Sequence, residues 1–222
     1  MKKRKNDIIS ILSREDISGS LSDILSMPAK SVLSPLFSAL LNPDELVRWH
    51  AITVMGLVVS KLADEDIEQG RIVMRRLMWS LNDESGGIGW GAPECMGEIM
   101  AEHWELSREF HSILFSYLVE RDDGADNFLE YLPLRKGAFW ALARLISERP
   151  DLGMTAYDNA LKALKSEDDP FILLCLCLYF KEAGKDPEEL SAKIKSVKDA
   201  EVDFYWDRKL STVRLGDMCS TA

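Results

Sequence analysis

The chain has 222 residues, a net charge of −10 and a hydrophobic content of 46%. This length and composition are typical of a folded protein with a sizeable core and exclude a disordered chain. The acidic excess argues against a nucleic-acid partner, because clustered Lys and Arg hold a phosphate backbone. A local basic patch stays compatible with this charge.

Cysteine spacing and hydropathy predict the compartment. The four cysteines form no CxxC pair, and Cys175 and Cys177 stand in an apolar run. This predicts neither a disulfide nor a zinc site. The basic N-terminal residues are followed by only about five apolar residues, which is too few for a signal peptide. No window approaches the roughly 18 uncharged apolar residues that a membrane-spanning helix needs. We expect a cytoplasmic protein with no membrane partner, no metal and no cofactor.

From the N-terminus, residues 1–27 are expected to form one or two short capping helices, within 6–26, that cover an exposed apolar face. Four later segments each carry a small residue followed by apolar residues three and four positions on, the mark of one buried helical face. They are 46–62, 87–103, 133–149 and 170–186, with the small anchor residues Ala51, Ala92, Ala138 and Cys175.

Each of these segments follows another apolar helix and a short acidic turn. The preceding helices are expected at 29–41, 67–81, 107–119 and 155–165. Asp and Asn in the turns can cap the next helix. The repeats are therefore predicted at about 28–62, 67–105, 107–149 and 155–186, with a final helix at 187–198 that completes a unit of residues 28–198.

Residues 199–222 differ from the repeats. Residues 201–218 alternate between apolar and polar, with Val202, Phe204 and Trp206 on one face, which predicts a hairpin that turns at 207–209. An isolated hairpin is only marginally stable in water, so it should dock on the last repeats or on a partner.

The stretches DELVRWHAITVMG (44–56) and LRKGAFWALARL (134–145) resemble the second helix of HEAT repeats. Over about residues 28–186 the chain looks like a HEAT-repeat protein of the armadillo-type superhelix, in the group of phycobilin-lyase-like HEAT repeats. The resemblance implies an all-α, right-handed α–α superhelix: a HEAT-like solenoid of about four helical pairs, here ended by a short C-terminal β-hairpin.

The second helices of such pairs normally line the concave face of a solenoid. Trp49 and Trp90 each stand two residues before an anchor, about 200° around the helix from the core-facing position. Exposed Trp and Arg are typical of binding surfaces, although Trp is also commonly buried between repeats. The predicted partner-binding groove comprises Arg48, Trp49, His50, Gly89, Trp90, Glu94, Arg135 and Lys136.

The glycine-rich stretch before Pro93 matches neither a dinucleotide fingerprint nor a P-loop, and Glu94 would repel a phosphate. Pro93 suits the first turn of a helix. A helix that begins late would leave free backbone N–H groups, so Gly87, Gly89 and Gly91 form a hypothetical anion notch.

Glu94, Glu98 and Glu102 share one helical face, for which the default interpretation is a solvated acidic surface. Glu98 aligns with Arg144 of the next unit, which predicts an ion pair between repeats. No metal-ligand spacing and no nucleophile motif accompany these carboxylates, so we identify no catalytic residues; whether the chain is an enzyme stays open.

These observations favour a non-catalytic scaffold or adaptor that binds a partner protein through the groove, although the step from fold to function is an analogy. One alternative is a chaperone or lyase for a tetrapyrrole cofactor, as the resemblance implies. Another is a HEAT-type DNA glycosylase, which the net acidity disfavours. A different small-molecule ligand is compatible with the sequence, but no motif supports it.

Overall fold

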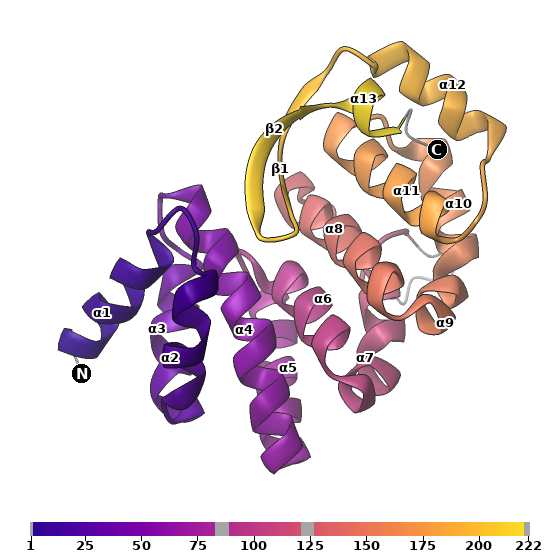
Figure 1. Ribbon diagram of the computed structural model, residues 1–222. Coiled ribbons are helices and arrows are strands. Elements are labelled where there is room, and N and C mark those ends of the chain that lie inside the picture. Colours follow the sequence, from indigo (N-terminus) through magenta and orange to yellow (C-terminus); the bar gives the residue numbers. More distant parts are fainter. Residues whose placement is uncertain (1, 83–88, 121–126, 220–222) are drawn as a thin grey trace.

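The structure is a computed structural model that describes residues 2–82, 89–120 and 127–219, with side chains from residue 6 onward. The chain is mostly helical and ends in one two-stranded antiparallel sheet (Figure 1). Both features were predicted from the sequence. Gly87 of the predicted anion notch lies outside the described residues.

Short helices open the chain, as predicted. They are α1 (Lys2–Leu12), the 3-10 helix η1 (Ser18–Ser20) and α2 (Leu21–Ser26). Helix α1 packs on α3 and α4, and α2 packs on α4. Their apolar residues Ile8, Leu12 and Ile24 are fully buried, so these helices cover one end of the core.

Within the described residues, the middle of the chain consists of successive helices. They are α3 (Ala29–Ala39), α4 (Glu45–Glu65), α5 (Ile67–Leu81), α6 (Ala92–Glu102), α7 (Trp104–Ser116), α8 (Leu132–Glu148), α9 (Pro150–Gly153), the 3-10 helix η2 (Met154–Ala156), α10 (Tyr157–Ser166), α11 (Pro170–Glu182) and α12 (Glu188–Val197). Each helix predicted between residues 29 and 198 is present, with ends that shift by a few residues.

Local sequence explains where these helices begin. The side chains of Asp44 and Asp169 accept hydrogen bonds from backbone amides in the first turns of α4 and α11, so the acidic turns do cap the helices that follow. Helix α6 begins later than residue 87, because Gly91 adopts a left-handed φ of 71° and ends the preceding turn. Pro93 then occupies the first turn of α6, as predicted.

The helices form two layers along an arc (Figure 1). Helices α4, α6, α8 and α11 pack side by side in that order, while α3, α5 and α7 pack behind them. The four anchor residues are at most 1% exposed, so the small side chains do lie where neighbouring helices meet. All four cysteines are free thiols.

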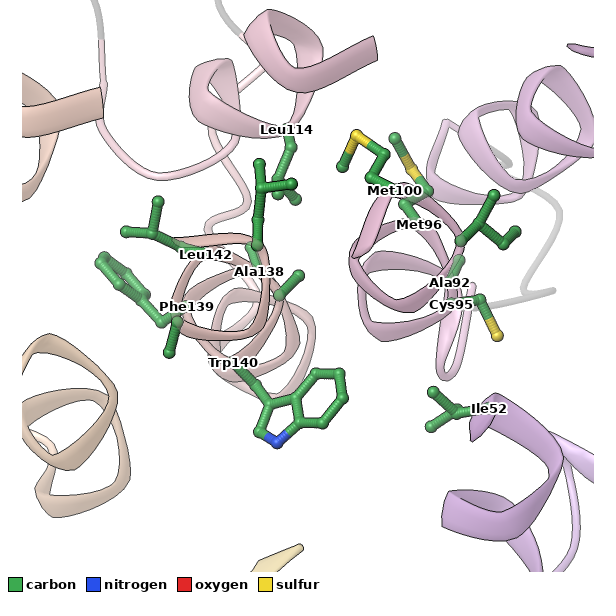
Figure 2. Close-up of a cluster of buried hydrophobic side chains, with 14 of the residues drawn as sticks. Ile52, Ala92, Cys95, Met96, Met100, Leu114, Ala138, Phe139, Trp140 and Leu142 are labelled. Atoms are coloured by element: carbon green, nitrogen blue, oxygen red, sulfur yellow. The ribbon is translucent and has the colours of Figure 1, made fainter. Parts of the chain in front are cut away.

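Helices α6 and α8 approach each other closely. A β-carbon added to Gly97 would lie 2.5 Å from the β-carbon of Ala141, so glycine lets the two backbones meet. Figure 2 shows Met96, Met100 and Leu142 on the core side of these helices, while Trp140 points to the other side of α8, toward the inside of the arc.

The C-terminal strands β1 (Glu201–Trp206) and β2 (Lys209–Arg214) pair in antiparallel register, with Phe204 opposite Ser211, and the short helix α13 (Leu215–Cys219) follows. Asp207 and Arg208 form a two-residue turn in which both have positive φ. That geometry matches the right-handed twist of the strands. The predicted hairpin is confirmed.

Helix α4 is long and apolar enough, by length and composition, to cross a membrane. It spans 21 residues, and 72% of its most apolar window is buried inside the protein. A central helix of a protein core has the same properties, and α4 packs against α3, α5 and α6.

The α6–α8 contact gives a test of this packing. Gly97→Ala should lower the free energy of unfolding by about 1–3 kcal/mol, because the added methyl group must push two backbones apart. Gly19→Ala is the matched control, since nothing lies within 4 Å of a β-carbon there. Urea unfolding followed by circular dichroism measures both; equal stability of the two variants would contradict the described α6–α8 spacing.

Candidate binding groove

The C-terminal hairpin lies inside the arc, across the face formed by α4 and α8 (Figure 1). The ring of Tyr205 stacks on Trp49, with centroids 5.1 Å apart and planes inclined by 4°. The hydroxyls of Tyr205 and Thr53 are hydrogen-bonded at 3.0 Å, and Trp140 Nε1 donates to the Tyr205 carbonyl at 2.8 Å. The hairpin therefore fills the middle of this face.

Trp49 and Trp90, which were predicted to lie in the same groove, differ in their exposure to solvent. Trp49 is only 7% exposed, because Tyr205 and Trp140 cover it. Trp90 is 38% exposed and meets Tyr131 edge to face at 5.8 Å. The core interpretation therefore applies to Trp49, and the exposed-surface interpretation applies to Trp90.

A pocket of about 450 Å³ lies beside the hairpin. It brings together residues from α4, α6, α8, α11 and β1. Most of the groove predicted from sequence meets here: the lining includes Arg48, Trp49, Trp90, Glu94 and Lys136, and also Gly91 of the predicted anion notch.

Three predicted groove residues serve the fold instead. His50 is fully buried, with Nδ1 2.9 Å from the carbonyl of Leu12, so its expected place in the groove is wrong: the N-terminal helix covers that side of α4. Arg135 holds the Glu167 carboxylate at 2.8 Å. Gly89 packs against the end of α5, where a β-carbon would lie 2.8 Å from the Ser80 carbonyl oxygen.

Glu94 is the unusual residue of the pocket. Its Oε2 atom is shut off from solvent and has no hydrogen-bond partner, which is costly for a carboxylate. Its carboxyl group rests on the backbone of α8 at Gly137, where a β-carbon would overlap it. Burial raises the pKa of Glu94 to about 7, against an opposing pull from its own backbone amide and from Arg48.

The charge of Glu94 affects whether the predicted anion notch can bind an anion. Gly91 lines the pocket, but so does the carboxyl group of Glu94, which stands in the first turn of α6. A second anion at this helix start would meet that negative charge. The geometry therefore favours a cation over the anion expected from the glycines.

A second, more polar pocket of about 710 Å³ lies at the turn end of the hairpin, where residues 205–209 line it. Here Arg144 Nε contacts Glu98 Oε2 at 2.8 Å, which confirms the predicted ion pair between α6 and α8. Glu98 is only 6% exposed, so the expected solvated acidic face is wrong at this position. Burial raises the pKa of Glu98 while Arg144 lowers it.

Sequence reasoning missed Thr53, Trp140 and Tyr205, which hold the hairpin in place. A signal for two of them was present. Thr53 follows Trp49 by four residues and Trp140 follows Lys136 by four, so each shares a helical face with a predicted groove residue. Tyr205 was missed because the alternation placed it on the opposite face of β1 from Phe204, whereas both of these adjacent residues are buried.

Comparison with known proteins adds a relative but no function. No family model matches the chain. A protein of Archaeoglobus fulgidus, described as uncharacterized, is 27% identical over 190 residues, which cover 83% of this chain and 92% of that protein. The two chains are thus similar over most of their lengths.

The raised pKa of Glu94 predicts a pH dependence of stability. Because the folded protein binds this proton more tightly than the unfolded chain does, stability should fall as pH rises from about 4.5 to about 7. Glu94→Gln removes this contribution, so the variant should gain stability relative to wild type between pH 5 and pH 8. Thermal melting across that range measures the difference.

Glu182→Gln is the control, because this glutamate is exposed at the end of α11. A constant difference between wild type and Glu94→Gln at every pH would contradict a buried, titrating Glu94.

Proposed function

We propose that the chain is a non-catalytic scaffold that binds a partner protein through the open part of its groove. In this proposal residues 28–198 form a right-handed HEAT-like superhelix of about four helical pairs, residues 1–27 cap it, and the 199–222 tail docks back into its concave face. The side-by-side order of α4, α6, α8 and α11, with α3, α5 and α7 behind, supports this arrangement.

The observation that carries the proposal is an exposed aromatic and apolar rim beside the pocket. Trp90 is 38% exposed, Tyr131 is 48% exposed and Leu132 is 37% exposed. Trp and Tyr next to a pocket are typical of the residues that dominate the binding energy of protein interfaces. The hairpin covers Trp49 but leaves this rim open, so a partner can use the part of the groove that the chain itself does not fill.

Binding is favoured over catalysis by the chemistry of the pocket. A carboxyl group that titrates near neutral pH suits general acid–base catalysis. Yet the described lining contains no Ser, Thr, Cys, His or Tyr, so it offers no hydroxyl, thiol or imidazole group as a catalytic partner for this carboxyl group.

The two alternative functions fit the lining less well. The carboxylates of a tetrapyrrole would meet four acidic side chains in this pocket: Glu45, Glu94, Glu201 and Asp203. A DNA glycosylase needs free cations to hold the backbone, but Lys136 is paired with Asp169 at 2.9 Å.

Trp90→Ala tests the proposal. The variant should remain folded, since Trp90 is partly exposed, and should lose at least about 2 kcal/mol of partner affinity, as interface tryptophans do. Crosslinking and affinity capture with the full chain from its native cells, quantified by mass spectrometry, compare it with wild type.

Trp79→Ala is the matched control, because Trp79 is 78% exposed on α5, away from the groove. A partner retained equally by wild type and by both variants would place binding elsewhere and refute the proposal.

A further inference from the structure

The pocket beside the hairpin carries more negative than positive charge. Four carboxylates line it against two cations. The acidic residues are Glu45 of α4, Glu94 of α6, and Glu201 and Asp203 of β1; the basic ones are Arg48 of α4 and Lys136 of α8.

Both cations are already engaged. Lys136 Nζ pairs with the Asp169 carboxylate at 2.9 Å. Arg48 Nη1 donates to the carbonyls of Asn42 and Pro43 at 2.9 and 3.1 Å, and among the described residues it forms no salt bridge with Glu94. The charge of Glu94 is therefore poorly compensated within the chain.

The described residues around Glu94 leave the charge of its carboxyl group poorly compensated. Gly137 leaves the space that the carboxyl group occupies against α8, and Oε2 has no hydrogen-bond partner. Although Oε2 is shut off from solvent, Glu94 as a residue is only partly buried and lines the pocket, so a ligand can approach its carboxyl group from that side. A ligand cation there would supply the missing charge compensation.

The aromatic side chains of the pocket favour one kind of cation over another. Trp90 and Phe171 line the same pocket, and Trp90 is open to solvent. A planar guanidinium group can stack on an aromatic ring and donate to a carboxylate at the same time, whereas an ammonium group acts as a point charge.

We propose that this pocket binds the guanidinium group of an arginine side chain presented by the partner protein. The inference rests on the proposed function for the source of the arginine, but not for the chemistry of the pocket. Glu94 supplies the charge, Trp90 supplies the stacking surface, and the carboxylates of β1 add to the attraction.

Short blocked peptides with one arginine, one citrulline or one lysine test the chemistry on the full-length protein. Citrulline has the shape of arginine without its charge. The arginine peptide should shift the indole N–H resonance of Trp90, assigned with Trp90→Phe, at least about tenfold more tightly than the citrulline peptide does. Equal binding of arginine and citrulline, or tighter binding of lysine, would overturn the proposal.

Glu94→Gln should weaken binding of the arginine peptide at least about tenfold, and wild-type binding should strengthen about tenfold from pH 6 to pH 8 as Glu94 ionises. The charged groups that line the pocket together with Glu94 are Arg48 and Glu45 on α4, Lys136 on α8, and Glu201 and Asp203 on β1. The thiols of Cys95 and Cys175 also lie within electrostatic reach of Glu94. Binding of the arginine peptide that changes neither with pH nor with the Glu94→Gln substitution would refute the role of Glu94.

The outcomes separate this inference from the proposed function. A partner captured through Trp90, with no arginine preference, leaves the scaffold function standing and removes the guanidinium site. Arginine binding that depends on Glu94, without any partner captured through Trp90, supports the guanidinium site and removes the scaffold function. Tighter binding of free agmatine than of the arginine peptide would make this a small-molecule site and overturn the protein partner.

Discussion

The contact between Tyr205 and the inner helices fixes the shape of the groove. Trp140 donates to the Tyr205 carbonyl, Thr53 meets its hydroxyl, and Trp49 stacks on its ring. A buried carbonyl without a partner costs about 1–3 kcal/mol, so the Trp140 hydrogen bond opposes any shift of β1 along the groove. With β1 fixed, the inner face is divided into two pockets of different character.

The division explains why two neighbouring glutamates of α6 behave differently. Glu98, in the more polar pocket, contacts Arg144 and completes a link between helices. Glu94, one turn earlier, lines the other pocket and rests against Gly137. Burial raises the pKa of both, but only Glu94 keeps a carboxylate oxygen without a partner. One carboxylate therefore stabilises the fold, and the other is available to a ligand.

Much of the helical layout was predictable, because its signals are local. The three- and four-residue spacing after Ala51 and Ala138 marks the core-facing sides of α4 and α8, and Asp44 and Asp169 mark helix starts. The late start of α6 was also visible, since Gly91 and Pro93 interrupt the pattern.

The candidate site was predictable only in part, because its decisive contacts join residues far apart in the chain. Trp49 and Trp90 occupy equivalent positions relative to their anchors, and no local pattern shows that Tyr205 covers only the first. His50 faces α1, and its burial follows from the docking of that helix. Such contacts depend on how the ends of the chain fold back, which helical periodicity does not encode.

The pocket is a property of the assembled protein more than of any single helix. Its walls come from α4, α6, α8, α11 and β1, so every wall is in place only when the hairpin is docked. Glu201 and Asp203 bring negative charge to a groove whose helices contribute both signs. Undocking β1 would remove these two carboxylates and uncover Trp49, leaving a wider, more aromatic and less acidic surface. A ligand that prefers the acidic pocket therefore stabilises the docked hairpin. The size of this effect equals the difference between its binding free energies to the docked and the undocked states.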